Sequence, residues 1–161
     1  MTTATAARIT VWGCVGWLVL AAPVSAQTRT LELVGTIPGP ATTVYVHGTI
    51  AYVSSGPTLQ LIDIGNPAEP RRLSSLTLPQ NIYGVRVSGG VACVAIDFDG
   101  LAIVDVSDPE SPTLLSSIEA GGQALSVAVA GATAVVANRL SGLEVFDVSA
   151  PASPVSLGAY Y

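Results

Sequence analysis

Short apolar runs separated by turn-forming residues extend along most of the chain. The runs are rich in valine, isoleucine, leucine and tyrosine, and each is bounded by glycine, proline, asparagine, aspartate or serine. This composition is typical of β-strands, and the turns between the runs are too short to contain helices. Outside the repeated block described next, the expected strands cover residues 44–46, 50–53, 72–78, 85–87, 91–96, 113–118, 127–129, 134–137 and 154–161.

A twelve-residue block with one aspartate and two prolines occurs three times. It reads LQLIDIGNPAEP from Leu59, LAIVDVSDPESP from Leu101 and LEVFDVSAPASP from Leu143. Proline fixes φ and ends a strand, whereas a short acid accepts hydrogen bonds from turn N–H groups, so each block is expected to turn the same corner. A metal site shared by the aspartates is the alternative, and stacking of the units separates equivalent positions and disfavours it. The residues that recur every 42 positions are Asp63, Asp105 and Asp147, Pro67, Pro109 and Pro151, and Pro70, Pro112 and Pro154.

The period and the strand count predict an all-β fold, a β-propeller-type repeat with four antiparallel strands per blade. Helical repeats of similar length need a 3.6-residue periodicity, which is not found here. Half of the residues (50%) are hydrophobic and only 11% are charged, as expected if stacked blades cover both faces of their inner strands. Closed propellers usually have about four to eight blades, so this is a partial propeller. The expected blades cover residues 43–78, 84–118 and 126–161, with flanking strand elements at 31–37 and 155–161.

The block LAIVDVSDP, from Leu101 to Pro109, resembles the LVIVD repeat family of bacterial and archaeal exported or surface proteins. The blocks from Leu59 and Leu143 resemble it less closely, because Ile64-Gly65-Asn66 and Ser149-Ala150 depart from the Val-Ser-Asp form. The resemblance covers nearly all of the chain after residue 26 and implies a β-propeller. It implies no reaction, because the family has no shared catalytic residues.

Residues 1–26 are expected to be a secretory signal peptide, and the repeats occupy residues 27–161. Arg8 is followed by an apolar run from Ile9 to Ala22, and Val24 and Ala26 hold the small-residue positions before a cleavage site. The apolar run is shorter than the roughly 20 residues of a membrane-spanning helix, so no span is expected in the mature chain. An exported protein is therefore expected, whether periplasmic, cell-surface or extracellular.

Charge and cysteine content exclude several classes of protein. The chain has a formal net charge of −5, which gives no electrostatic basis for binding nucleic acid or an anionic membrane. Cys93 is the one cysteine after residue 26, so a disulfide framework is excluded, and its apolar surroundings predict a buried, inert thiol.

The sequence contains no recognisable catalytic constellation, and neither a metal nor a cofactor is expected. His47 is the only histidine, and no Gly-x-Ser-x-Gly motif supports a nucleophilic serine. The segment Asp97-Phe98-Asp99-Gly100 contains the D-x-D-G core of calcium loops, but the other ligand positions of such a loop are not present. We interpret it as a hairpin turn, with a weak single calcium site as the alternative.

Propeller geometry nevertheless indicates where a ligand would bind. Loops that enter the first strand of each blade share one face with the turns that join the second strand to the third. This polar, mixed-sign set predicts a non-catalytic module that binds a protein or a surface polymer. The alternative is part of a propeller enzyme, lactonase-like or hydrolase-like, whose active site lies on blades not present here. The candidate ligand-binding residues are Asn81, Tyr83, Asp97, Asp99 and Arg139, with Asn138 beside them.

Three blades leave an apolar face open at each end of the stack, and such faces need a cap or a partner. A piece of a longer propeller is the favoured interpretation, because the sequence stops at Tyr161 within a strand-like run. The alternative is a second copy of the chain, which would close a six-bladed ring head to tail.

Overall fold

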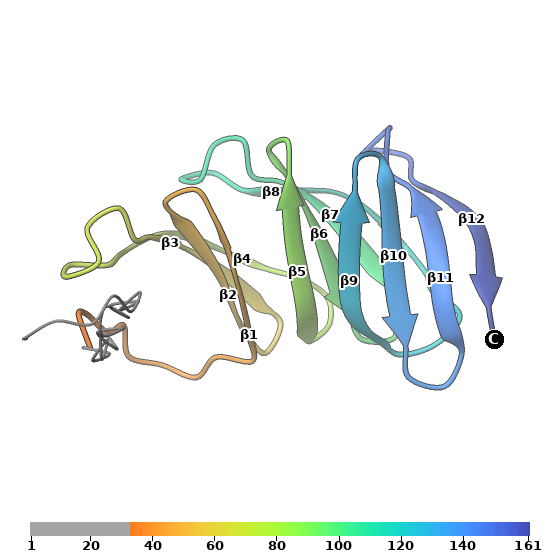
Figure 1. Cartoon of the computed structure of the whole chain (residues 1–161), viewed down its shortest axis with the longest axis horizontal. Helices are drawn as coiled ribbons and strands as arrows, with labels where there is room; N and C mark the ends of the chain where they lie inside the picture. Colours follow the sequence, from red (N-terminus) through yellow and green to blue (C-terminus); the bar gives the residue numbers. More distant parts are fainter. Residues whose placement is uncertain (1–32) are drawn as a thin grey trace, which may run out of the picture. The chain divides into compact units, whose positions relative to one another are not determined.

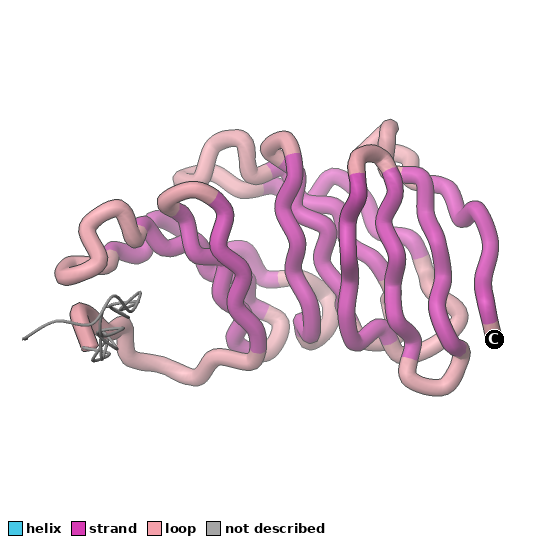
Figure 2. The backbone as a smooth tube through the Cα atoms, viewed as in Figure 1, coloured by secondary structure: helices cyan, strands magenta, loops and turns pink. Residues whose placement is uncertain are grey.

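The computed structural model describes residues 33–161, which form three four-stranded antiparallel sheets (Figures 1 and 2). The first sheet contains β1 (Thr43–His47), β2 (Ile50–Ser55), β3 (Thr58–Asp63) and β4 (Arg71–Thr77). The second contains β5 (Ile82–Ser88), β6 (Val91–Ile96), β7 (Leu101–Asp105) and β8 (Thr113–Ile118). The third contains β9 (Ala124–Ala130), β10 (Thr133–Asn138), β11 (Gly142–Asp147) and β12 (Val155–Tyr160).

Each sheet is one blade, because its four strands follow one another in the sequence and pair in that order. The expected all-β, propeller-type repeat is confirmed, and the three sheets do not close into a ring. None of the described residues lies in a helix long and apolar enough to cross a bilayer. The expected signal peptide lies outside the described residues.

Glycine makes the tight turn between the first two strands of every blade. Gly48, Gly89 and Gly131 have φ values of 60°, 58° and 58°, in the left-handed region that glycine enters without steric cost. The hairpin β1–β2 therefore pairs in register from Thr43 with Ser54 to His47 with Ile50.

Two apolar clusters hold the sheets together, and both include residues of the second sheet. Val94 and Val104 pack toward the first sheet, whereas Cys93 and Ile103 pack toward the third. The second sheet is thus covered on both faces, which explains why its run from Val91 to Ile96 is apolar without alternation. Neighbouring sheets meet mainly through their first strands, since β5 contacts both β1 and β9.

The segment before β1 differs from the sequence-based expectation. A strand was expected over residues 31–37, but residues 33–41, here called the strap, form none. A strand needs a neighbour to pair with, and the third strand of a preceding blade is not supplied by the described residues. The strap instead lies over the outward side of the first sheet, as the hollows described below show. At the other end, residues 155–160 form β12, the fourth strand of the third sheet itself.

Candidate interaction site

Backbone hydrogen bonds join the loops that are expected to share one face. We define the loop face as the turns at residues 56–57, 97–100 and 139–141 together with the connections at 78–81 and 119–123. Between the first and second blades, the N–H of Ile82 donates to the carbonyl of Gly56 at 2.9 Å. Between the second and third, the N–H of Ala124 donates to the carbonyl of Asp97 at 2.8 Å. The loops are therefore carried on a rigid scaffold, as is common in binding proteins.

Residues Asp97 to Gly100 form a hairpin turn between β6 and β7. The N–H of Asp99 donates to the carbonyl of Ile96 at 3.0 Å, and the N–H of Ile96 donates to that of Gly100 at 2.8 Å. Asp97 has a φ of 46°, an uncommon value for a residue other than glycine. Within residues 33–161, no three His, Cys, Asp or Glu side chains come together as a set that could hold a metal ion.

Two buried acceptors lie on either side of Ala124. Asp97 forms an isolated bridge with Ala124, and Asn138 pairs with the same residue in the β9–β10 ladder. Both side chains are buried, and neither Oδ1 atom has a hydrogen-bond partner among the described residues. Buried acceptors without partners are rare in folded proteins because losing water costs free energy. These two acceptors belong to neighbouring blades and lie beneath the loop face.

The structure brings some of the sequence-predicted residues together. Ile82 pairs with Ile96, so Asn81 and Asp97 lie at the same end of the β5–β6 hairpin. Arg139 donates its N–H to the carbonyl of Gln123 at 2.9 Å, and its guanidinium lies 3.5 Å from the side-chain oxygen of Gln123. The side chains of Asn81 and Arg139 are exposed, and that of Asp99 is half-buried.

Tyr83 lies within β5 rather than in the loop before it. It is half-buried and occupies the irregularity between Ile82 and Gly84, where the pairing with β6 shifts. Its distance along the strand from the turn tips places it at the margin of the loop face.

Two apolar side chains of the loop face were not identified from the sequence. Phe98 is 67% exposed and Leu140 is 91% exposed. Each occupies the turn between the second and third strands of its blade, a position that projects from the sheet. Their positions in the sequence could have indicated this exposure, because an apolar residue in a hairpin turn lies too far from the sheet to be buried in the core.

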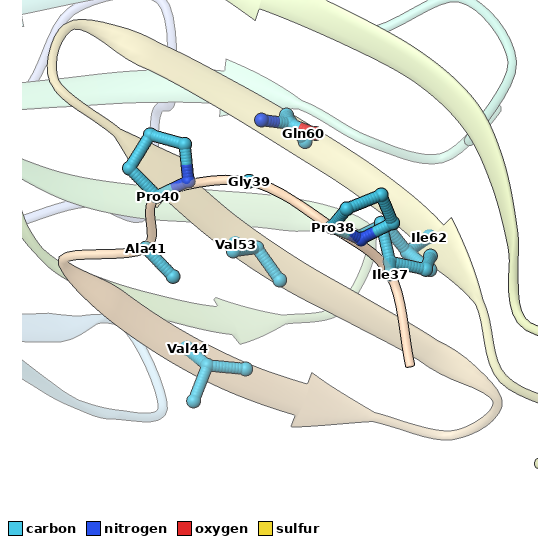
Figure 3. Close-up of a pocket in the computed structure, with 9 residues that line it drawn as sticks. All are labelled: Ile37, Pro38, Gly39, Pro40, Ala41, Val44, Val53, Gln60 and Ile62. Carbon is cyan, nitrogen blue, oxygen red and sulfur yellow. The ribbon is translucent and has the colours of Figure 1, made fainter. Parts of the chain in front are cut away.

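A separate apolar hollow lies beneath the strap (Figure 3). It has a volume of about 250 Å³ and is lined by Ile37, Pro38, Val44, Val53 and Ile62 among others. An adjoining hollow of about 350 Å³ reaches Ile64, Pro67 and Pro70. No titratable side chain lines either hollow, so neither offers acid or base groups to a ligand.

The repeated aspartates are the last residues of β3, β7 and β11. The Oδ1 atoms of Asp63, Asp105 and Asp147 accept the N–H of the residue two positions later at 2.8, 2.9 and 2.8 Å. The Ser107 hydroxyl and then its N–H lower the pKa of Asp105. The N–H of Ser149 and then its hydroxyl lower the pKa of Asp147. Each contact satisfies a turn donor, the ordinary role of aspartate at such positions.

Neither His47 nor Cys93 belongs to the loop face. His47 is exposed at the end of β1, beside the turn at Gly48. Cys93 is buried between the second and third sheets, and burial raises the pKa of its thiol to about 11. A thiol in this state is a poor nucleophile at neutral pH.

Comparisons with known proteins agree with this architecture. The model of the LVIVD repeat family matches residues 38–77, 81–119 and 121–161. None of the curated proteins compared with the chain matches it. The computationally designed Ika4 protein is similar in structure, with a TM-score of 0.64 and 12% identity over 82% of this chain and 80% of Ika4.

Two longer solved chains are similar as well. The computationally designed Ika8 protein has a TM-score of 0.60 and 15% identity over 74% of this chain and 37% of Ika8. A chain in the structure of S. cerevisiae Dbp5 bound to Nup159, Gle1, IP6 and ADP has a TM-score of 0.54 and 15% identity, over 84% of this chain and 34% of its own length. The present chain thus spans about a third of each. At these identities the similarity concerns the fold alone.

Proposed function

This chain belongs to the LVIVD repeat family, and from that premise we propose that it is an exported, non-catalytic β-propeller module that binds a protein or a surface polymer through its loop face. The proposal is supported chiefly by the two exposed apolar side chains, Phe98 and Leu140, at the tips of neighbouring turns. Both tips are held by backbone hydrogen bonds, so a partner would meet them with little loss of conformational entropy.

The surroundings of these two side chains are polar. Asn81 and Arg139 are exposed on the loop face, and Asp97 and Asn138 hold unpaired oxygens below it. An apolar centre with polar groups of mixed sign around it is the usual composition of a protein-binding surface. The same composition also suits a polymer that offers both apolar faces and hydroxyl groups.

Export is proposed from the N-terminal sequence. Arg8, the apolar run from Ile9 to Ala22 and the small residues Val24 and Ala26 have the order of a secretory signal. The mature protein is then expected in the periplasm, at the cell surface or outside the cell. N-terminal sequencing of the protein after expression of the full gene tests this, with Gln27 as the expected first residue. A chain that retains Met1 and stays in the cytoplasm would contradict export.

Binding through the loop face is tested with labelled protein and intact cells of the producing organism. We expect the double variant Phe98→Ser, Leu140→Ser to lose at least about tenfold in affinity for those cells, because exposed apolar anchors dominate recognition. The control Leu114→Ser removes a large apolar side chain that is 41% exposed on β8, outside the loop face. The proposal fails if the double variant, folded by circular dichroism, binds like the wild type, or if the control loses as much.

A further inference from the structure

One contact between blades recurs in the structure. The hydroxyl of Ser74 in β4 donates to the carbonyl of Pro109 in the second blade at 2.6 Å. The hydroxyl of Ser116 in β8 donates to the carbonyl of Pro151 in the third blade, also at 2.6 Å. In both cases the fourth strand of one blade therefore holds the proline turn of the next.

Each end of the stack has the positions that form this contact, although Gly158 in β12 has no hydroxyl to donate. Gly158 in β12 pairs with Val145, as Ser74 pairs with Leu61, and no atom of the structure lies within 4 Å of where its Cβ would be. At the other end, the strap occupies the equivalent place beside Pro67. A Cβ added to Gly35 would overlap the carbonyl oxygen of Pro67 and lie 3.1 Å from Cδ of Pro70.

The strap and β12 have similar sequences at these positions. Val34-Gly35-Thr36-Ile37 matches Leu157-Gly158-Ala159-Tyr160 in its order of large, glycine, small and large residues. The strap thus holds against the first sheet the position that a fourth strand holds at the two internal junctions. It does so without being a strand, because it has no third strand to pair with.

The apolar positions behind these contacts also match. We define the back face of the third sheet as Val135, Leu143 and Val145. Leu143 is 39% exposed, and the other two are half-buried. The corresponding residues of the first two sheets pack against the next blade and are buried: Tyr52, Leu59 and Leu61 in the first, and Cys93, Leu101 and Ile103 in the second.

The front face of the first sheet corresponds to the surface on which such a back face packs at the internal junctions. We define this front face as Val44, Val46, Val53 and Ile62. Val44 is 60% exposed, whereas its counterparts Val85 and Val127 are buried against a preceding blade. The strap covers this face incompletely and leaves the apolar hollows of about 250 and 350 Å³.

We propose that a second copy of the chain docks the back face of its third sheet on this front face, head to tail, and that its β12 displaces the strap from Pro67. The interface would continue, position by position, the two junctions already present inside the chain. Two copies that dock in this way at both ends form a closed ring of six blades, within the usual range of about four to eight for propellers. The strap then acts as a stand-in for β12 in the single chain.

The first test uses the full chain, purified from the compartment in which it accumulates, and light scattering at tens of micromolar concentration. The expected mass is twice that of one chain. Leu143→Arg on the back face and Val44→Arg on the front face each replace a partly exposed apolar side chain with a charged one, so both variants are expected to fold. Because the charge lies in the proposed interface, both variants are expected to be single chains. A wild-type protein with the mass of one chain overturns the proposal, as do variants that retain the doubled mass.

Mixing the two variants distinguishes head-to-tail docking from other contacts. The Leu143→Arg chain keeps a normal front face, and the Val44→Arg chain keeps a normal back face, so the mixture is expected to form a one-to-one complex. A contact between identical surfaces would stay blocked after mixing. Absence of the mixed complex therefore overturns the head-to-tail arrangement.

Displacement of the strap has its own test. Gly35→Val places a side chain against the Pro67 carbonyl, so it is expected to detach the strap and lower the dissociation constant of the pair at least about threefold, because the free front face becomes more populated. Thr36→Val is the matched control, since Thr36 is exposed in the strap. A Gly35→Val pair that dissociates more readily than the control overturns the displacement.

Discussion

The guanidinium carbon of Arg86 lies 5.1 Å from the centre of the Tyr45 ring, and this contact joins β5 of the second sheet to β1 of the first. The same guanidinium donates to the carbonyl of Val85 at 2.7 Å, which fixes its direction. A cation above an aromatic ring is attracted by the ring's negative face. The first strands of the first two blades are therefore joined by a cation–π contact in addition to their apolar packing.

Replacing that charge is expected to weaken the junction of the first two sheets. Arg86→Met keeps much of the apolar stem and is expected to lower the free energy of unfolding by about 1 kcal/mol, from the lost attraction and hydrogen bond. Urea denaturation followed by circular dichroism measures this. Arg72→Met is the control, since Arg72 is exposed on β4, and an equal loss in the control would contradict the role assigned to Arg86.

The serine contacts between blades are expected to add stability. Ser74→Ala leaves the carbonyl of Pro109 without this donor and is expected to cost about 1 kcal/mol of unfolding free energy. Ser75→Ala changes the exposed neighbour on the same strand and is expected to cost less than about 0.5 kcal/mol. Chemical denaturation of both variants, measured side by side, gives the two changes in unfolding free energy. Equal midpoints would mean that the bond contributes nothing measurable.

Gly100 lies directly against the β8–β9 connection. A Cβ added there would overlap the backbone N of Ala120 and lie 2.9 Å from the carbonyl carbon of Glu119, at a φ of 80°. Gly100→Ala is therefore expected to lower the free energy of unfolding by about 3 kcal/mol or more. Gly89→Ala, at a φ of 58° with open space around it, is expected to cost only about 1 kcal/mol. Thermal unfolding that ranks the two variants equally would exclude the crowding at Gly100.

The contact between Asp105 and Ser107 predicts how stability depends on acid pH. The pKa of Asp105 is lowered in the folded chain by the hydroxyl and the N–H of Ser107, so the stabilisation is complete above the unfolded pKa of about 3.9. It is lost as pH falls through the lower folded pKa. Asp105→Asn removes the charge and is expected to flatten this part of the curve of unfolding free energy against pH. Ser107→Ala is expected to flatten it partly, and an unchanged slope in both variants would contradict the assignment.

The buried thiol of Cys93 is expected to make the folded chain less stable as pH rises into the alkaline range. Burial raises the pKa of its thiol to about 11, so the folded thiol stays protonated where an unfolded thiol, with a pKa near about 8.5, ionises. The free energy of unfolding should therefore fall as pH rises between these values, and Cys93→Ala should reduce that fall. At neutral pH, iodoacetamide should label Cys93 only in urea, as located by peptide mass spectrometry. Rapid labelling of the folded chain would show that the thiol is accessible.

Much of the fold could be predicted because the repeat constrains it. The 42-residue spacing of Asp63, Asp105 and Asp147 fixes the unit, and the apolar runs between turn residues fix its strands. The strap could not be predicted in the same way. Its residues 33–37 have the composition of a fourth strand, but a strand also requires a paired neighbour, and composition does not report whether one is present.

The candidate site was less predictable than the fold. The sequence indicates which turns share an edge, because that follows from strand order. It does not indicate which turn side chains remain exposed, so Phe98 and Leu140 were missed. It also does not indicate that Asp97 and Asn138 flank the same residue. That depends on Ala124 pairing both with Asn138 of its own blade and with Asp97 of the preceding blade.

Each sheet is made from one uninterrupted stretch of chain, and sheets that touch are consecutive in the sequence. Among residues 33–161, no segment has to thread past another to reach its place, so the loops closed during folding are short. Any blade can therefore serve as a starting point from which order spreads to its neighbours. Because each blade is one continuous stretch of sequence, it is also encoded by one continuous stretch of the gene. Duplication of one 42-residue unit adds a blade while the path of every other blade stays the same.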